Sequence, residues 1–381
     1  MDERRSPRRL IITVMVIAII AVTLIVIYNR FISKSDTYTG YSVTKRIERE
    51  STSDNRYIKN GAFLSTYNTE GITTYNNKGD VIWNAGVSLD NPRTVSAGDF
   101  FAAADIGGRK LYVIDESVDP ATPVEIDTLA DILEISIAKN GTVAVLLEED
   151  AGYRIQLIDP SDGNNVIAEI ATTVKDDGYA VGLALSPDGT RIVTSYFKDK
   201  SGTLTSSLTF YNFTSAGENS NADRIVGAFP IADTLFSDIE FIDNSTVVCT
   251  GDNLIECYSF SRSPAEKWKY NVNGKIKMTS MDPTGMAAVI EESDSEKLYV
   301  IDMASGKALV EEALDIDIIG LEYMNCVAAV HTDTAIRLLN RDGSILYEGS
   351  YDDGIQFMAN AGKKNKYYIV SSAHIDVVTL Q

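Results

Sequence analysis

One short stretch, LALSPDGTRIVTSY at 183–196, holds side chains that could do chemistry together. It places Ser186, Asp188 and Arg191 within six residues, and a hydroxyl, a carboxylate and a guanidinium recur in nucleophilic and anion-binding sites. SPDGT also has the preferred residues of a type I turn, with Ser first, Pro second and Gly fourth. Alternating apolar residues predict a strand on either side. We therefore predict a hairpin corner whose Asp188 and Arg191 are solvated, and no reactive site.

Little else in the sequence indicates catalysis. His331 and His374 are the only histidines, and neither has the spacing of a zinc site or of a catalytic triad. We expect no cofactor and no metal, and we assign no catalytic residue. A pair of carboxylates acting on a glycan is an alternative, but the many acidic residues give no means of choosing the pair.

The three cysteines are too few for a disulfide framework in a chain of 381 residues. Cys249 and Cys257 flank one predicted hairpin turn, so a cross-strand disulfide is conceivable. We favour three buried thiols, with Cys326 as the third, each acting as a small apolar side chain.

The strand–turn–strand pattern of the first stretch recurs along the chain. Clear copies are SIAKNGTVAVLL, SMDPTGMAAVI and FIDNSTVVCT, and with weaker copies there are eight units at a mean spacing of 43 residues. Each unit continues with a strand such as LYVID and a further turn and strand. Four short strands in a period of 40–50 residues are typical of a β-propeller blade. We predict an all-β, eight-bladed propeller over 33–381, its last blade closed by residues 37–49; seven blades are the alternative.

The first residues differ from the rest. Leu10–Ile27 is an apolar run of 18 residues without a charge, about long enough to cross a bilayer. The sequence predicts a short cytoplasmic tail over 1–9 and a single-pass transmembrane anchor over 10–32. Four arginines precede the run and two basic residues follow it closely, so the positive-inside rule places the propeller outside the cytoplasm.

Charge constrains the partners of the propeller. Residues 1–35 carry six basic and two acidic side chains, which leaves 28 basic against 52 acidic for the rest. Such an acidic body repels nucleic acid, so we expect no nucleic-acid partner. Such a charge attracts divalent cations or a basic partner, although solubility alone also explains it.

The fourth unit is the longest, at 56 residues. Its extra length is predicted to lie mainly in a polar loop between LTFYNF and DRIVGAF, and long loops on rigid scaffolds often bind ligands. The residues that we select as candidate binding residues in this unit are Tyr179, Tyr196, Tyr211, Asn212, Asp223 and Arg224.

Two resemblances support this interpretation. GDVIWNAG and AEKWKYNV, with Trp83 and Trp268, resemble the repeats of quinoprotein-like and WD40-like propellers, although most units lack the tryptophan. The N-terminal anchor together with DGYAVGLALSPDGTRIVTSY, FYNFTSAGEN and ADRIVGAF is similar to a family of membrane-anchored propellers of Gram-positive bacteria with a domain of unknown function. This resemblance implies the topology and an envelope location but no activity.

The functional hypothesis is a non-catalytic scaffold, held at the outer surface of the cell membrane, that binds a protein or cell-envelope partner. The scarcity of histidine and the rigid repeats favour it. The alternatives are an enzyme acting on envelope glycans and a sensor that binds a small ligand in the central channel and acts through a membrane partner.

Overall fold

The computed structural model describes residues 37–381 apart from 50–53, 119, 163–164, 201, 221, 294 and 315. The predicted cytoplasmic tail and membrane anchor therefore lie outside the described residues. Within the described part of the chain, no helix is long and apolar enough to span a bilayer.

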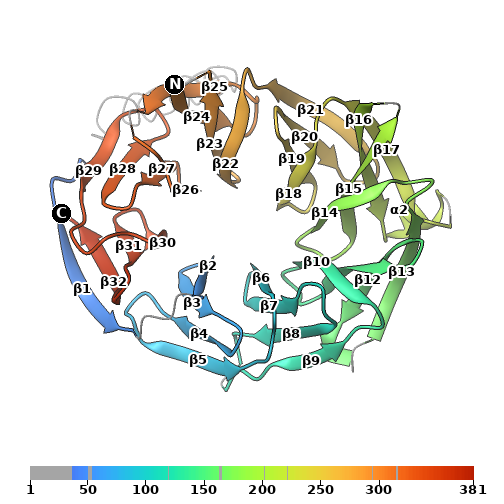
Figure 1. The fold of residues 1–381 in the computed structure, drawn as a ribbon, viewed down its shortest axis with the longest axis horizontal. Coiled ribbons are helices and arrows are strands. Elements are labelled where there is room, and N and C mark those ends of the chain that lie inside the picture. Colours follow the sequence, from blue (N-terminus) through green and yellow to red (C-terminus); the bar gives the residue numbers. More distant parts are fainter. Residues whose placement is uncertain are drawn as a thin grey trace, which may run out of the picture.

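Eight four-stranded antiparallel sheets form the fold, and each is one blade of a closed ring (Figure 1). The expected eight blades are confirmed, and the seven-bladed alternative is wrong. Blade 1 contains β2 (Arg56–Asn60), β3 (Phe63–Tyr67), β4 (Gly71–Tyr75) and β5 (Val81–Gly86). Blade 2 contains β6 (Pro92–Ala97), β7 (Phe100–Asp105), β8 (Lys110–Asp115) and β9 (Val124–Asp127). Blade 3 contains β10 (Asp131–Ile137), β11 (Val143–Glu149), β12 (Gly152–Asp159) and β13 (Asn165–Thr173). Blade 4 contains β14 (Tyr179–Leu185), β15 (Arg191–Lys200), β16 (Thr203–Asn212) and β17 (Ile225–Ala232).

The second half of the ring repeats the plan, with the first strand of each blade innermost. Blade 5 contains β18 (Phe236–Asp243), β19 (Thr246–Gly251), β20 (Leu254–Phe260) and β21 (Pro264–Asn271). Blade 6 contains β22 (Lys275–Asp282), β23 (Gly285–Glu292), β24 (Ser295–Asp302) and β25 (Ala308–Leu314). Blade 7 contains β26 (Gly320–Met324), β27 (Val327–His331), β28 (Ala335–Asn340) and β29 (Ile345–Ser350). Blade 8 contains β30 (Phe357–Lys363), β31 (Lys366–Val370), β32 (His374–Leu380) and β1 (Tyr41–Glu48).

The core lies between neighbouring blades. The middle strands are buried along most of their length, as all six residues of TVVCTG in β19 are, because a neighbouring blade packs on each of their faces. The outermost strands alternate between buried and exposed residues, as VIWNAG of β5 does, since one face is open to solvent. Trp83 on β5 packs against Phe101 of blade 2, and its indole Nε1 donates to Glu116 at 2.9 Å.

The ring closes through the strand nearest the N-terminus. β1 pairs with β32 from Tyr41 opposite Leu380 to Glu48 opposite His374. The Arg46 side chain crosses this seam, with its Nη2 2.6 Å from Asp376 and 2.7 Å from Asp353. β1 completes blade 8 as its outermost strand, so that β32 is an interior strand of the sheet and not an exposed edge that could pair with another chain.

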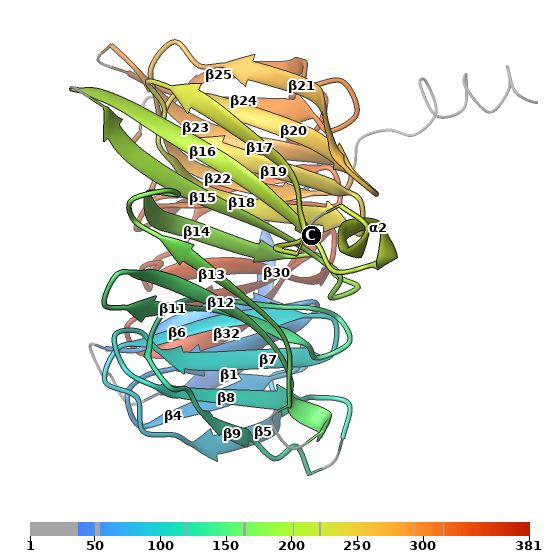
Figure 2. The same cartoon turned by 90° about the vertical axis from the view of Figure 1, so that its right-hand side faces the viewer.

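The two faces of the ring are made by different connections. The turns between the first and second and between the third and fourth strands form one face, which also holds Thr37 and Gln381; we call it the terminus face. The turns between the second and third strands and the links between blades form the other. The β15–β16 hairpin projects from that second face (Figure 2), so we call it the hairpin face. The extra length of the fourth unit is therefore shared between this hairpin and the loop that carries helix α2 (Ser215–Glu218).

The cysteines are all free thiols. Cys249 faces the core shared with blade 4 and Cys257 the core shared with blade 6, because they lie on opposite sides of blade 5. A bond between them is excluded by this arrangement. Both are buried as expected, whereas Cys326 is only half-buried, at the turn that joins β26 to β27.

Candidate binding surface

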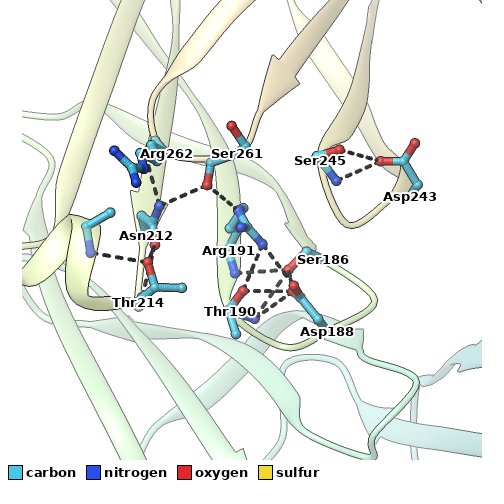
Figure 3. A network of polar contacts seen from close by, with 11 residues as sticks. Ser186, Asp188, Thr190, Arg191, Asn212, Thr214, Asp243, Ser245, Ser261 and Arg262 are labelled. Carbon is cyan, nitrogen blue, oxygen red and sulfur yellow. Dashed lines mark hydrogen bonds and ion pairs between the residues drawn. The ribbon is translucent and has the colours of Figure 1, made fainter.

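The SPDGT turn joins β14 to β15 at the terminus face, and its polar groups satisfy one another (Figure 3). Ser186 is fully buried, and its hydroxyl donates to the Asp188 carboxylate at 2.6 Å and accepts from the Arg191 backbone N–H at 3.0 Å. Although partial burial opposes ionisation, hydrogen bonds from Ser186 and Thr190 lower the pKa of Asp188. The serine is thus occupied as a turn former, as predicted.

Arg191 does more than the sequence suggested. It pairs with Asp188 at 2.9 Å, and its Nε donates to the Ser261 carbonyl of blade 5 at 3.0 Å. The exposed fractions of the Arg191 and Asp188 side chains are 14% and 32%, so the prediction that both are solvated is wrong. The cause is the neighbouring blade, whose turn covers the guanidinium and accepts its hydrogen bond.

Asn212, a candidate binding residue, is fully buried and holds the same seam together (Figure 3). Its amide nitrogen donates to the Arg262 carbonyl of blade 5 at 3.0 Å. Its amide oxygen accepts from the backbone N–H of Thr214 at 2.9 Å and from its hydroxyl at 2.6 Å. With both ends of the amide engaged, Asn212 positions the loop and is closed to an external ligand.

The loop after Asn212 folds compactly around helix α2. Thr214 caps the helix by accepting from the Ala216 N–H, as N-cap threonines do. Arg224 has a left-handed backbone with φ of 58°, stacks on the Phe213 ring at 5.6 Å and pairs with Glu218 at 3.3 Å. Asp223 beside it is exposed on the terminus face.

Of the three candidate tyrosines, two form a buried pair and the third is exposed. Tyr196 and Tyr211 are 1% exposed each, with their hydroxyls 3.1 Å apart. Burial raises the pKa of Tyr196 to about 12 and raises that of Tyr211 as well. Tyr179, by contrast, is 51% exposed and stacks on Phe197 at 5.2 Å, on the hairpin face. The six candidate residues therefore do not form one site.

A more accessible surface lies on the same hairpin face, at blades 2 and 3. Leu129 is the most exposed large apolar residue described, at 86%. Thr128 fixes this link by donating its hydroxyl to the carbonyls of Ala130 at 2.8 Å and Arg109 at 3.1 Å, which leaves Leu129 at the tip. Its signal in the sequence was one leucine inside the polar link DTLAD, which strand periodicity does not detect.

Acidic side chains surround Leu129. A hollow of about 810 Å³ is lined by Leu129, by four acidic residues and by one basic residue, together with two alanines: Arg109, Leu129, Ala130, Asp131, Glu148, Glu149, Asp150 and Ala151. Only Asp131 and Glu149 have ion-pair partners within the described residues around this hollow, Arg109 at 2.9 Å and Arg154 at 2.6 Å. Apolar anchors within an acidic rim are suited to binding a basic, partly apolar surface. We call the hollow together with Tyr179 the acidic patch.

Comparison with solved structures identifies the fold. The chain is similar to Sqt1 of Saccharomyces cerevisiae, with 14% identity, a TM-score of 0.57, and coverage of 91% of this chain and all of the other. It is similar to Raptor of Chaetomium thermophilum at 9% identity and a TM-score of 0.51, over 91% of this chain and 29% of that one. The dihydro-heme d1 dehydrogenase NirN gives 15% identity and a TM-score of 0.50, over 74% and 60%. At such identities the likeness supports the propeller fold alone.

The search of curated proteins found no match. The profile of one family covers residues 34–380, which is nearly the whole propeller. The chain therefore belongs to DUF5711, a family of unknown function.

Proposed function

We propose that this protein is a membrane-anchored, extracytoplasmic propeller that acts as a non-catalytic scaffold and binds a protein partner through the acidic patch. The observation that carries the proposal is the exposure of Leu129 in a hollow lined by carboxylates, with the exposed Tyr179 on the same face of the ring. Exposed apolar residues that are grouped and rimmed by polar ones are typical of interaction sites.

The direction of the chain supports this assignment. The described chain begins at Thr37 on the terminus face. An anchor over 10–32 would hold that face toward the membrane and leave the hairpin face, with the acidic patch, directed away from it. A partner with a basic surface and one or two apolar side chains fits this patch, and an acidic envelope polymer does not.

Site-specific photo-crosslinking tests the proposed partner surface. A photoreactive amino acid is placed at Leu129, at Tyr179, or at Asp223 on the terminus face as the control, in the full-length protein in cells. We expect one partner band at positions 129 and 179 and none at 223. The double substitution L129D/Y179A should lower the crosslinked fraction by at least tenfold. Equal crosslinking at all three positions, or its persistence in the double variant, would contradict the proposal.

Cysteine labelling tests the location separately. C326A removes the half-buried thiol, and D150C then provides one exposed thiol, since Cys249 and Cys257 are buried. We expect a membrane-impermeant maleimide to label D150C in intact cells. Labelling that requires lysis would show that the propeller is cytoplasmic.

A further inference from the structure

The central channel contains a cavity that the proposed scaffold function does not use. The cavity has a volume of about 610 Å³, which is in the range of small-molecule sites. It lies among the inner strands (Figure 1) and reaches the turns at Lys139, Pro187 and Pro283, so it opens at the terminus face, opposite the acidic patch.

The walls are mostly apolar. They come from six blades, and the residues that form them include Ile58, Val95, Ile137, Leu185, Phe241 and Ile242. A wall of this kind favours a ligand with an apolar body, because burying such a body against it removes apolar surface from water.

Two polar groups of the wall lack partners. The Glu240 side chain on β18 lines the cavity, is exposed to the solvent of the channel, and forms no hydrogen bond or ion pair with any described residue. Thr94, 8% exposed, also lines the cavity, and its hydroxyl has no hydrogen-bond partner among the described residues. A buried hydroxyl without a partner costs free energy, and a ligand that hydrogen-bonds with it would recover that cost.

The other charges near the channel do not neutralise Glu240. Arg93 on β6 pairs with Glu134 on β10 at 2.7 Å, and Lys59 on β2 pairs with Glu322 on β26 at 2.5 Å. The charged groups that act most strongly on Glu240 are Asp238 on its own strand and Asp282 at the end of β22, and both are acidic. Lys139 lies at the exposed mouth of the cavity.

We propose that this cavity binds a small organic ligand that has an apolar body and a protonated amine, with Glu240 as the counter-ion and Thr94 as a second polar contact. A bare metal ion fits less well, because calcium and magnesium need about six oxygen ligands and Glu240 is the one carboxylate in the wall.

Proton release provides a specific signature. Desolvation inside the channel, with the nearby Asp238 and Asp282, raises the pKa of Glu240 to about 8, although its side chain keeps contact with the water of the channel. At pH 7 the carboxyl is therefore mostly protonated, and pairing with an ammonium ionises it and releases one proton to the buffer. Since an alkylammonium has a pKa near 10, the amine stays charged up to about pH 9.

The test is calorimetric titration of the full-length protein in detergent with 2-phenylethylamine, and with 2-phenylethanol as its uncharged match. We expect the amine to bind at least tenfold more tightly than the alcohol, and about 5–10-fold more tightly at pH 8.5 than at pH 7. The heat at pH 7 should vary with the ionisation enthalpy of the buffer, as release of a proton requires. Uptake by micelles is the same for every variant and cancels between them.

Three variants complete the design. E240Q should lower the affinity for the amine at least tenfold and leave that for the alcohol unchanged, and T94V should lower it a few-fold. E266Q is the matched control on the exposed outer strand β21 and should bind like the wild type. Equal affinity for amine and alcohol, no binding of the amine, or unchanged binding in E240Q would each overturn the proposal. None of these results bears on the acidic patch, which lies on the other face.

Discussion

Asn212 shows how a single polar side chain stabilises the seam between two blades. It is fully buried, and its amide joins the blade 4 loop to the Arg262 carbonyl of blade 5. We predict that N212A lowers the free energy of unfolding by about 2–3 kcal/mol, because several buried partners lose their hydrogen bonds. Chemical denaturation measures this loss. D223A, on the exposed end of the same loop, should change the free energy of unfolding by less than about 0.5 kcal/mol. An equal loss in N212A and D223A would show that Asn212 does not stabilise the seam between the blades.

A second prediction at the scale of one residue concerns how Glu240 makes the stability of the protein depend on pH. Its pKa of about 8 in the folded protein exceeds the ordinary value of 4.5, so the folded state binds a proton that the unfolded state releases. Its contribution to stability is complete below pH 4.5 and is lost as the pH rises to 8. E240Q should therefore gain stability over the wild type at pH 8, by about 1–2 kcal/mol given the access of water to the channel, and little at pH 4.5. Thermal unfolding of the wild type and E240Q at both pH values measures the gain in stability. A gain that is the same at both pH values would show that the raised pKa of Glu240 is not its cause.

The structural elements differ in how well they could be predicted from the sequence. Turn chemistry and apolar periodicity predicted the strands and the SPDGT corner, because both act between residues close in the chain. The burial of Tyr211 depends on blade 3 and that of Asn212 on blade 5, and no local pattern encodes which blade covers a side chain. Leu129 was not predicted because it is an exposed residue in a link between strands, and the apolar periodicity of the strands does not extend to such links.

β1 is the element whose loss has the largest expected effect. Arg46 neutralises Asp376, which is fully buried and also accepts from the Tyr351 hydroxyl. R46A should lower the free energy of unfolding by more than D353N does, because the buried Asp376 carboxylate loses its cation. D353N removes only the more exposed partner and should cost less than about 1 kcal/mol. Similar losses in the two variants would show that Asp376 does not depend on Arg46.

At the scale of the whole molecule, the eight blades act as one ring because β1 and β32 hold it closed. A chain that lacks residues 37–48 should expose the β32 edge, associate with other copies and lose its cooperative unfolding. Light scattering and circular dichroism measure both changes. A circular permutant that joins Gln381 to Thr37, with new ends at the exposed Gly202 turn, should fold normally, since Thr39 already lies against Gln381. A monomeric, cooperatively folded deletion variant would show that the closure is dispensable.

The pairing of β1 with β32 also means that the ring cannot close until the end of the chain has been synthesised. Ser42 contacts Thr379, 337 positions later in the chain, and a ribosome that adds about 5–20 residues per second needs on the order of 15–70 s to cover that interval. Throughout it, the first strand is made but has nothing to pair with. A nascent chain that is released one strand early lacks β32, so β1 has no partner and blade 8 stays incomplete. Premature termination therefore yields an open ring and never a smaller propeller.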